Sequence, residues 1–282
     1  MAHLLVTRKG WQNEHLGLFI LSKLAFCANP VTVSDDLGSD FFCCLFSLRK
    51  YRNQDTVVPQ SSFAIQIKSS SDTFDVSNKV EYLRDLEIPY LVGVVDNDQL
   101  TLTLYSGEFL PLFFGLRGTP ERLRFKLVNR RVSIERFNER YRANRYRILL
   151  PRVAEIRADS KVSDLQTTVT RLQALCERIQ GNIATRRTQE HIYSLDRIDR
   201  PHYILAGAGS AKVFRENVYK RVAEAYFNFR WIIENRPQDY DPNEVALYDE
   251  FFRQLKKQKR PLPKLLTRIH HRFHKYLQDH GN

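Results

Sequence analysis

Alternation of apolar and polar residues organises the first third of the chain. Between Phe63 and Lys68, large apolar residues occupy every second position, with small or polar residues between them. Since successive side chains of a strand face opposite sides, this pattern predicts a strand with one core face and one face carrying Gln66 and Lys68. Residues 41–46 are apolar on both faces and predict a second, internal strand. The polar residues 47–61 between the two strands predict a hairpin loop.

Apolar residues spaced three and four apart predict helices around these strands. Residues 15–26 are apolar around most of a helical circumference, so they predict a buried helix that Glu14 opens. A second helix is expected over residues 80–86, followed by a buried strand at 90–95 and an alternating one at 100–104. The order strand, helix, strand predicts a crossover connection and hence some parallel pairing in the sheet.

Helical spacing dominates the C-terminal part of the chain. Ser163–Gln166 has the pattern of a capping box and predicts the start of a long helix. Apolar residues then recur in a four-three alternation, which is typical of a coiled-coil-like seam. This seam is expected to pack on a neighbouring helix or on a second copy, so a homodimer or a protein partner through residues 163–186 stays open. Further helices are predicted at about residues 210–236, 242–258 and 263–278.

The charge of the chain is unevenly distributed. Residues 1–110 carry 9 Lys and Arg against 13 Asp and Glu, whereas residues 111–282 carry 35 against 19. An acidic region beside a basic one suits metal-dependent chemistry on a polyanion, and the alternative is a solvated basic surface. No apolar run is long enough to cross a bilayer, and the N-terminus lacks the order of a secretory signal. We therefore expect a cytoplasmic protein without membrane contact.

Arginine is concentrated between residues 117 and 157, with aromatic residues interleaved. Guanidinium groups bind phosphate oxygens in pairs, and aromatic faces stack on unpaired bases. The segment therefore predicts a nucleic-acid-binding surface, although a solvated connector helix is the alternative. The predicted nucleic-acid ligands are Arg130, Arg131, Arg140, Arg142, Arg145 and Arg147.

Four polar residues lie at the starts or on one face of predicted elements and are candidates for metal binding and catalysis. Glu14 begins a core-facing helix, and a buried carboxylate needs a cation or hydrogen bonds. Asp40 begins a strand, and Gln66 and Lys68 share one face of the next strand. Carboxylate and amide oxygens are ligands that Mg²⁺ accepts, and a lysine can orient a water or stabilise developing charge. A favourable contact with the helix dipole is the alternative explanation of Glu14.

These residues resemble the active site of the PD-(D/E)XK nuclease superfamily, and most closely its Mrr-like branch and an uncharacterised prokaryotic family. That family has the motifs G-x-x-G-E, D-x-G-x-D and Q-x-K, which stand here as Gly10 with Glu14, Asp36–Asp40 and Gln66–Lys68. The resemblance extends to about residue 110. It implies an α/β fold with a restriction-endonuclease-like central mixed sheet flanked by helices, followed by a mainly α-helical C-terminal domain. The expected domains are a nuclease domain (1–115), an arginine-rich connector (116–160) and a helical domain (161–282).

The resemblance also implies an activity. The chain would be a Mg²⁺- or Mn²⁺-dependent endonuclease that hydrolyses phosphodiester bonds in DNA, in prokaryotic antiviral defence or DNA processing. Glu14, Asp40, Gln66 and Lys68 would be catalytic, with Asp40, Gln66 and Glu14 as metal ligands. Because Gln66 replaces the commoner acid, a catalytically inactive DNA-binding or scaffold subunit is the alternative function. A subunit that works through its heptad helix is a third. A zinc site at the histidines of the last predicted helix is disfavoured against a basic helix surface.

Overall fold

The computed structural model describes most of the chain, and contacts between residues divide it into two units. We call them the sheet unit (residues 1–187 and 191–208) and the helical unit (188–190 and 209–282). The boundaries predicted at residues 115 and 160 both lie inside the sheet unit. The described residues are 2–29, 38–52, 54–70, 73–188, 192–196, 201–205, 211–257 and 262–280.

The sheet unit is built on one mixed sheet, as predicted. Its strand order within the described residues is β1-β2-β3-β5-β6-β9-β7-β4, with β8 paired to β9. The pairs β3–β5 and β7–β9 are parallel and the others are antiparallel, so the expected crossover is confirmed. The strands are β1 (Ala25–Ala28), β2 (Phe41–Tyr51), β3 (Gln54–Lys68), β4 (Phe74–Asp75), β5 (Tyr90–Asp96), β6 (Thr101–Ser106), β7 (Arg122–Val128), β8 (Asn138–Arg142) and β9 (Arg145–Arg157).

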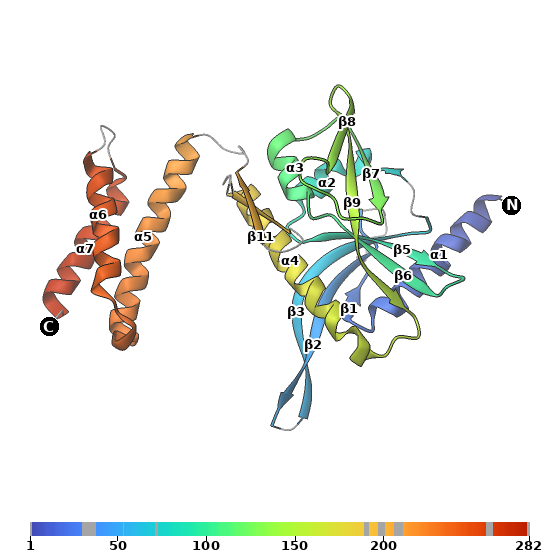
Figure 1. Ribbon diagram of the computed structural model, residues 1–282, viewed down its shortest axis with the longest axis horizontal. Helices are drawn as coiled ribbons and strands as arrows, with labels where there is room; N and C mark the ends of the chain where they lie inside the picture. Colours follow the sequence, from blue (N-terminus) through green and yellow to red (C-terminus); the bar gives the residue numbers. More distant parts are fainter. Residues whose placement is uncertain are drawn as a thin grey trace. The chain divides into compact units, whose positions relative to one another are not determined.

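Helices cover both faces of this sheet (Figure 1). The large apolar residues Phe63, Ile65 and Ile67 of β3 are buried under α1 and α4, whereas Ala64 belongs to the core under α2 and α3. The predicted division of β3 into two faces is therefore confirmed. The helices are α1 (Ala2–Leu21), α2 (Val80–Asp85) after the 3₁₀ turn η1 (Ser77–Lys79), α3 (Leu110–Arg117), and α4 (Gln166–Arg187) after η2 (Val162–Leu165).

The first helix differs from the prediction at both ends. It begins at Ala2, so Glu14 lies inside α1 instead of opening it, and the dipole at the helix N-terminus does not account for this carboxylate. Residues 15–26 were expected to be helical, but α1 ends at Leu21 and Ala25–Ala28 form β1. β1 pairs antiparallel with β2, with Ala25 opposite Leu45. Backbone hydrogen bonds to a neighbouring strand therefore outweigh the local helical spacing, which is a weak preference.

The predicted loop at residues 47–61 is wrong. These residues continue β2 and β3 into a long hairpin, in which Ser47 lies opposite Val58 and Tyr51 opposite Gln54 (Figure 1). The side chains of Arg49 and Thr56, which face each other across the pair, are exposed. Polar residues can occupy such a ribbon because its ladder needs only backbone groups.

The arginine-rich segment is part of the sheet and not a connector helix. Residues 116–160 contribute β7, β8 and β9, and β9 pairs with β6 of the predicted nuclease region. In β7, Leu123 and Phe125 are fully buried while Arg122 and Lys126 are exposed. The alternation is that of a strand with one solvated face.

The apolar seam of α4 packs inside the chain. Val169, Leu172 and Ile179 belong to the same buried core as the β3 residues, and α4 also packs on the neighbouring α3, so the seam is covered within this chain by the sheet and by a helix. The capping box predicted at Ser163 is also absent: Ser163 lies within η2, and its hydroxyl donates to Asp164 at 3.1 Å. Any homodimer through residues 163–186 would have to use the solvent-exposed side of this helix.

The helical unit matches the predicted helices closely. It contains α5 (Ala211–Asn235), η3 (Pro237–Asp239), α6 (Pro242–Lys257) and α7 (Lys264–His280). The core that these helices share includes Tyr226 and Phe252. An unpredicted hairpin of β10 (Ile192–Asp196) and β11 (Pro201–Leu205) belongs to the sheet unit. Among the described helices, none has the length and apolar character that crossing a membrane requires.

Candidate active site

Asp40 is held beside β3 by a tight turn. Gly38 adopts φ +103°, which residues with a Cβ rarely take, and a Cβ there would lie 2.7 Å from a ring carbon of Tyr82. The Asp40 amide donates to the Ile65 carbonyl at 2.8 Å, and its carboxylate Oδ2 accepts from the Ile67 amide. The turn and the two hydrogen bonds therefore fix this carboxylate at the C-terminal end of β3.

Gln66 is almost fully buried, with 3% of its surface exposed. Its neighbours favour one orientation of its amide. The Tyr90 hydroxyl donates to the Gly38 carbonyl at 3.1 Å, so its single proton is not available to Gln66. The amide nitrogen of Gln66 therefore faces Tyr90 Oη at 3.1 Å. Its oxygen then accepts from Lys79 Nζ at 3.0 Å and from Lys68 Nζ at 3.2 Å. Both lone pairs of the amide oxygen are used by ammonium groups.

Two members of this cluster, Lys79 and Tyr90, are not identified by the sequence pattern. Lys79 lies in η1 and is only 8% exposed, although lysines are almost never so deeply buried without acceptors. In the sequence, Lys79 directly precedes the apolar face of α2. A solvated lysine is also common at such a position, so the sequence does not indicate that Lys79 is buried. Tyr90 begins a strand that the sequence predicts simply as buried.

Glu14 comes within electrostatic reach of the same cluster. Burial raises the pKa of its carboxyl group, and the nearby Asp40 carboxylate raises it further, while His15 and Lys68 act in the opposite direction. Lys68 itself is partly buried, with its ammonium 5.1 Å from the centre of the Phe74 ring. The structure thus brings all four predicted site residues together. Asp36, the first acid of the D-x-G-x-D motif, lies outside the described residues.

The arrangement fits a divalent cation. Two carboxylates, Glu14 and Asp40, lie close enough for their like charges to oppose each other, and a bound cation would relieve that repulsion. Carboxylate oxygens are the ligands that Mg²⁺ and Mn²⁺ prefer. The Gln66 oxygen, by contrast, could join such a set only after one ammonium group moves away.

The six predicted nucleic-acid ligands lie on the β7–β9 part of the sheet unit, and they fall into two groups. Arg145 is ion-paired with Glu121 at 2.8 Å and Arg147 with Glu139 at 2.9 Å, so their charges are partly compensated. The other four are exposed. Arg140 and Arg142 flank the exposed Tyr141 opposite the start of β9, where the Tyr141 ring lies 5.9 Å from the guanidinium of Arg147. Arg130 and Arg131 follow the other end of β7, which pairs with β9 near Pro151. We call these four the arginine surface: Arg130, Arg131, Arg140 and Arg142.

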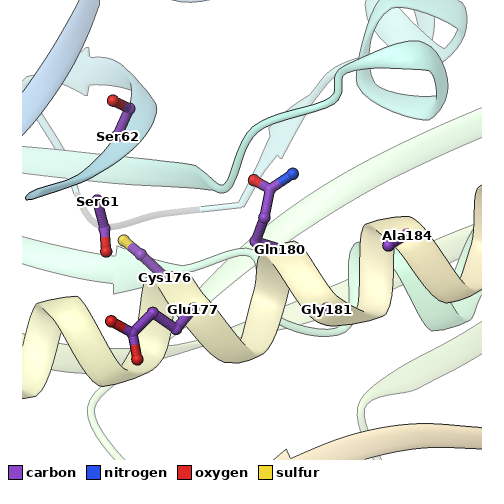
Figure 2. A pocket seen from close by; sticks show the side chains of 7 residues that line it. All are labelled: Ser61, Ser62, Cys176, Glu177, Gln180, Gly181 and Ala184. Carbon is purple, nitrogen blue, oxygen red and sulfur yellow. The ribbon is translucent and has the colours of Figure 1, made fainter. Parts of the chain in front are cut away.

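A hollow of about 390 Å³ between β3 and α4 contains hydroxyl and thiol groups but none of the predicted site residues (Figure 2). Cys176 points from α4 toward the strand segment that carries Ser61 and Ser62 (Figure 2). Burial raises the pKa of the Cys176 thiol to about 12, so this thiol stays protonated at neutral pH. Since the thiolate is the nucleophilic form, the hollow does not offer a cysteine nucleophile.

Comparisons of the chain with protein-family models, with curated proteins and with solved structures gave no match.

Proposed function

We propose that this chain is a metal-dependent nuclease of the PD-(D/E)XK type that cuts DNA. The observation that carries the proposal is the meeting of Glu14, Asp40, Gln66 and Lys68 at one end of β3, from three separate elements of the chain. The order α1, β1, β2, β3, β4, α2, β5, with β3 and β5 parallel, agrees with the restriction-endonuclease-like core that the motif implies.

In this proposal Asp40 and Glu14 hold Mg²⁺ or Mn²⁺. When bound, the ion would neutralise phosphate charge and make water a better nucleophile. Lys68 stabilises the negative charge that develops on the phosphate, because its ammonium donates to the Gln66 oxygen and lies within electrostatic reach of Glu14. Lys79 places a second ammonium group on the Gln66 oxygen, next to that of Lys68.

Gln66 acts in this proposal mainly by positioning. Its oxygen accepts from both ammonium groups and its nitrogen donates to Tyr90, so it fixes the distance between the two lysines. The alternative in which Gln66 is itself a metal ligand requires its oxygen to exchange an ammonium group for the ion. A spectroscopic or crystallographic study with Mn²⁺ would distinguish these roles.

A second candidate function is a DNA-binding protein without cleavage. The neutral amide at Gln66 favours it, because the site has one negative charge fewer than an acidic motif would give and its oxygen is already occupied. The arginine surface would then supply the affinity, and the Asp40 cluster would be only a remnant of a catalytic site.

Cleavage of supercoiled plasmid and of single-stranded DNA, with Mg²⁺ or Mn²⁺, tests the proposal. We expect Asp40→Ala and Lys68→Ala to lower the cleavage rate by at least about 100-fold, as is common when a charge-stabilising group is lost. Asp279→Ala, which removes an exposed carboxylate from the helical unit, is the matched control and should cleave normally.

Two outcomes would contradict the nuclease. Equal cleavage by the parent and both site variants would point to a contaminant and remove the catalytic assignment. Absence of cleavage with either metal, together with retained DNA binding by the parent, would favour the second candidate function.

A further inference from the structure

Three metal-binding side chains converge in the helical unit. Asp249 lies on α6, and His270 and His274 lie one helical turn apart on α7. One potential ligand atom from each residue lies within 4.8 Å of the others. The Nε2 atom of His274 is 2.9 Å from Asp249 Oδ1, and that of His270 is 3.3 Å from the same oxygen.

Hydrogen bonding alone accounts poorly for this convergence. The Tyr226 hydroxyl also donates to Asp249 Oδ1, at 2.9 Å, so three polar atoms crowd one carboxylate oxygen. An oxygen of this kind offers two lone pairs. Metal–ligand bonds of about 2.0–2.1 Å in a tetrahedral site separate neighbouring ligand atoms by roughly 3.3 Å. The two Asp–His separations, 2.9 and 3.3 Å, are close to that value, and all three atoms lie within 4.8 Å of one another.

The two imidazoles are held in place by aromatic packing. The His270 ring stacks on Phe252 with their centres 3.9 Å apart and their planes within 8°. The His274 ring is in edge contact with Phe273, and the two imidazole centres are 4.4 Å apart. Ligands that are already oriented lose little freedom when an ion binds, so this packing favours a preformed site.

We propose that Asp249, His270 and His274 bind a divalent transition-metal ion of the Zn²⁺ class. Two imidazoles and one carboxylate select such ions over Mg²⁺, which prefers oxygen ligands. Three protein ligands leave a fourth position for water or another small ligand. The side chains of the three residues are 19–34% exposed, so an ion can enter from solvent. The ion links α6 to α7, and Tyr226 orients the carboxylate through its hydrogen bond to Asp249 Oδ1.

This site lies in the helical unit and uses none of the proposed nuclease residues. The full-length chain without an affinity tag, freed of metal by a chelator, is titrated with Co²⁺, and visible absorbance reports coordination by nitrogen and oxygen. Zn²⁺ is then added in competition. We expect one equivalent of Co²⁺ to give the signal and one equivalent of Zn²⁺ to abolish it.

Variants assign the ion to this cluster. His274→Gln and Asp249→Asn should weaken Co²⁺ binding by about 100-fold or more, and Tyr226→Phe by about 10-fold, in the range that loss of an orienting partner gives. His271→Gln changes an exposed histidine on the same helix and should bind as the parent does. Asp40→Ala should also bind normally, which separates this site from the proposed nuclease site.

The thermal unfolding temperature gives a second readout, because an ion that binds only the folded chain stabilises it. We expect Zn²⁺ to raise this temperature for the parent and for His271→Gln, but not for His270→Gln. The proposal is overturned if the parent binds neither ion, if all variants bind equally, or if Zn²⁺ leaves the parent's unfolding temperature unchanged. A cluster that serves only as a hydrogen-bond network would give that last result.

Discussion

Glu14 is the residue whose environment makes the clearest prediction. Its pKa is raised by burial and by Asp40, so the folded chain binds this proton more tightly than the unfolded chain does. The group therefore costs stability once it ionises, and that cost appears as the pH rises from the unfolded value of about 4.3 through the higher folded value. At neutral pH, without metal, Glu14→Gln should unfold at a higher urea concentration than the parent. Near pH 4 and below, the difference should shrink.

Metal should reduce this difference in stability. A cation between Glu14 and Asp40 would stabilise the ionised carboxylates, so Mg²⁺ or Mn²⁺ should raise the urea midpoint of the parent more than that of Glu14→Gln. Glu81→Gln, an exposed acid on α2, is the control and should respond to neither pH nor metal in this way. A parent that is the more stable protein at neutral pH in chelator would contradict the assigned cause of the shift.

Gly38 is the residue that sets the position of Asp40. Gly38→Ala would place a methyl group 2.7 Å from the Tyr82 ring in a backbone conformation that already disfavours side chains. We expect it to lower the free energy of unfolding by roughly 1–3 kcal/mol, typical of a strained backbone position, and to reduce cleavage by displacing the carboxylate.

Gly10→Ala provides a matched comparison for that variant. Gly10 lies within α1, and a Cβ there meets nothing within 4 Å. Alanine is favoured over glycine in a helix, so this variant should be as stable as the parent or slightly more stable. Equal stability of the two alanine variants would show that the turn does not need a glycine.

The residues of the candidate site were predictable only where they follow a repeating pattern. Gln66 and Lys68 stand at strand positions that alternation identifies, and Asp40 directly precedes the apolar run of β2. Lys79 and Tyr90 reach the Gln66 amide only through the crossover from β3 to β5, and nothing local in the sequence marks them. A pairwise contact of this kind depends on tertiary structure, which the sequence pattern does not specify.

At the scale of elements, the seam of α4 is the contact that joins helix to sheet. Leu172→Ala removes a side chain that is 1% exposed and should lower the free energy of unfolding by about 2–5 kcal/mol through the cavity it leaves. Because the seam packs within one chain, the denaturation midpoint should be independent of protein concentration. Arg171→Ala, its exposed neighbour, should have little effect. A midpoint that rises with concentration would indicate that the seam holds copies together.

Elements were predicted well where side-chain periodicity and backbone pairing agree. The helices α5, α6 and α7 have a clear amphipathic period and need no distant partner for their assignment. β1 and the outer part of the β2–β3 hairpin form because another strand supplies their hydrogen bonds. In β9, the buried Tyr146 and Ile148 alternate with partly exposed arginines. The many charges of this segment therefore masked the pattern of a strand with one buried face.

At the scale of the whole molecule, the excess of positive charge is only partly available to a polyanion. Several arginines of the sheet unit are ion-paired with acids on neighbouring segments, as Arg145 is with Glu121 and Arg124 with Asp75. Exposed pairs contribute little to stability, but they reduce the local field that a phosphate would meet. The formal net charge of +12 therefore overstates what the surface offers, and the arginine surface is the part on which affinity should depend.

Salt dependence measures that contribution directly. Each phosphate that a guanidinium neutralises adds about 0.7 to the slope of log Kd against log salt for single-stranded DNA, because counterions are released. Replacing all four residues of the arginine surface with glutamine should therefore lower the slope by up to about 3 and weaken binding most at low salt. An unchanged slope would place the DNA elsewhere on the molecule. The charge-matched control replaces four exposed basic residues of the helical unit, and it should bind as the parent does: Lys212, Lys220, Lys264 and Arg268.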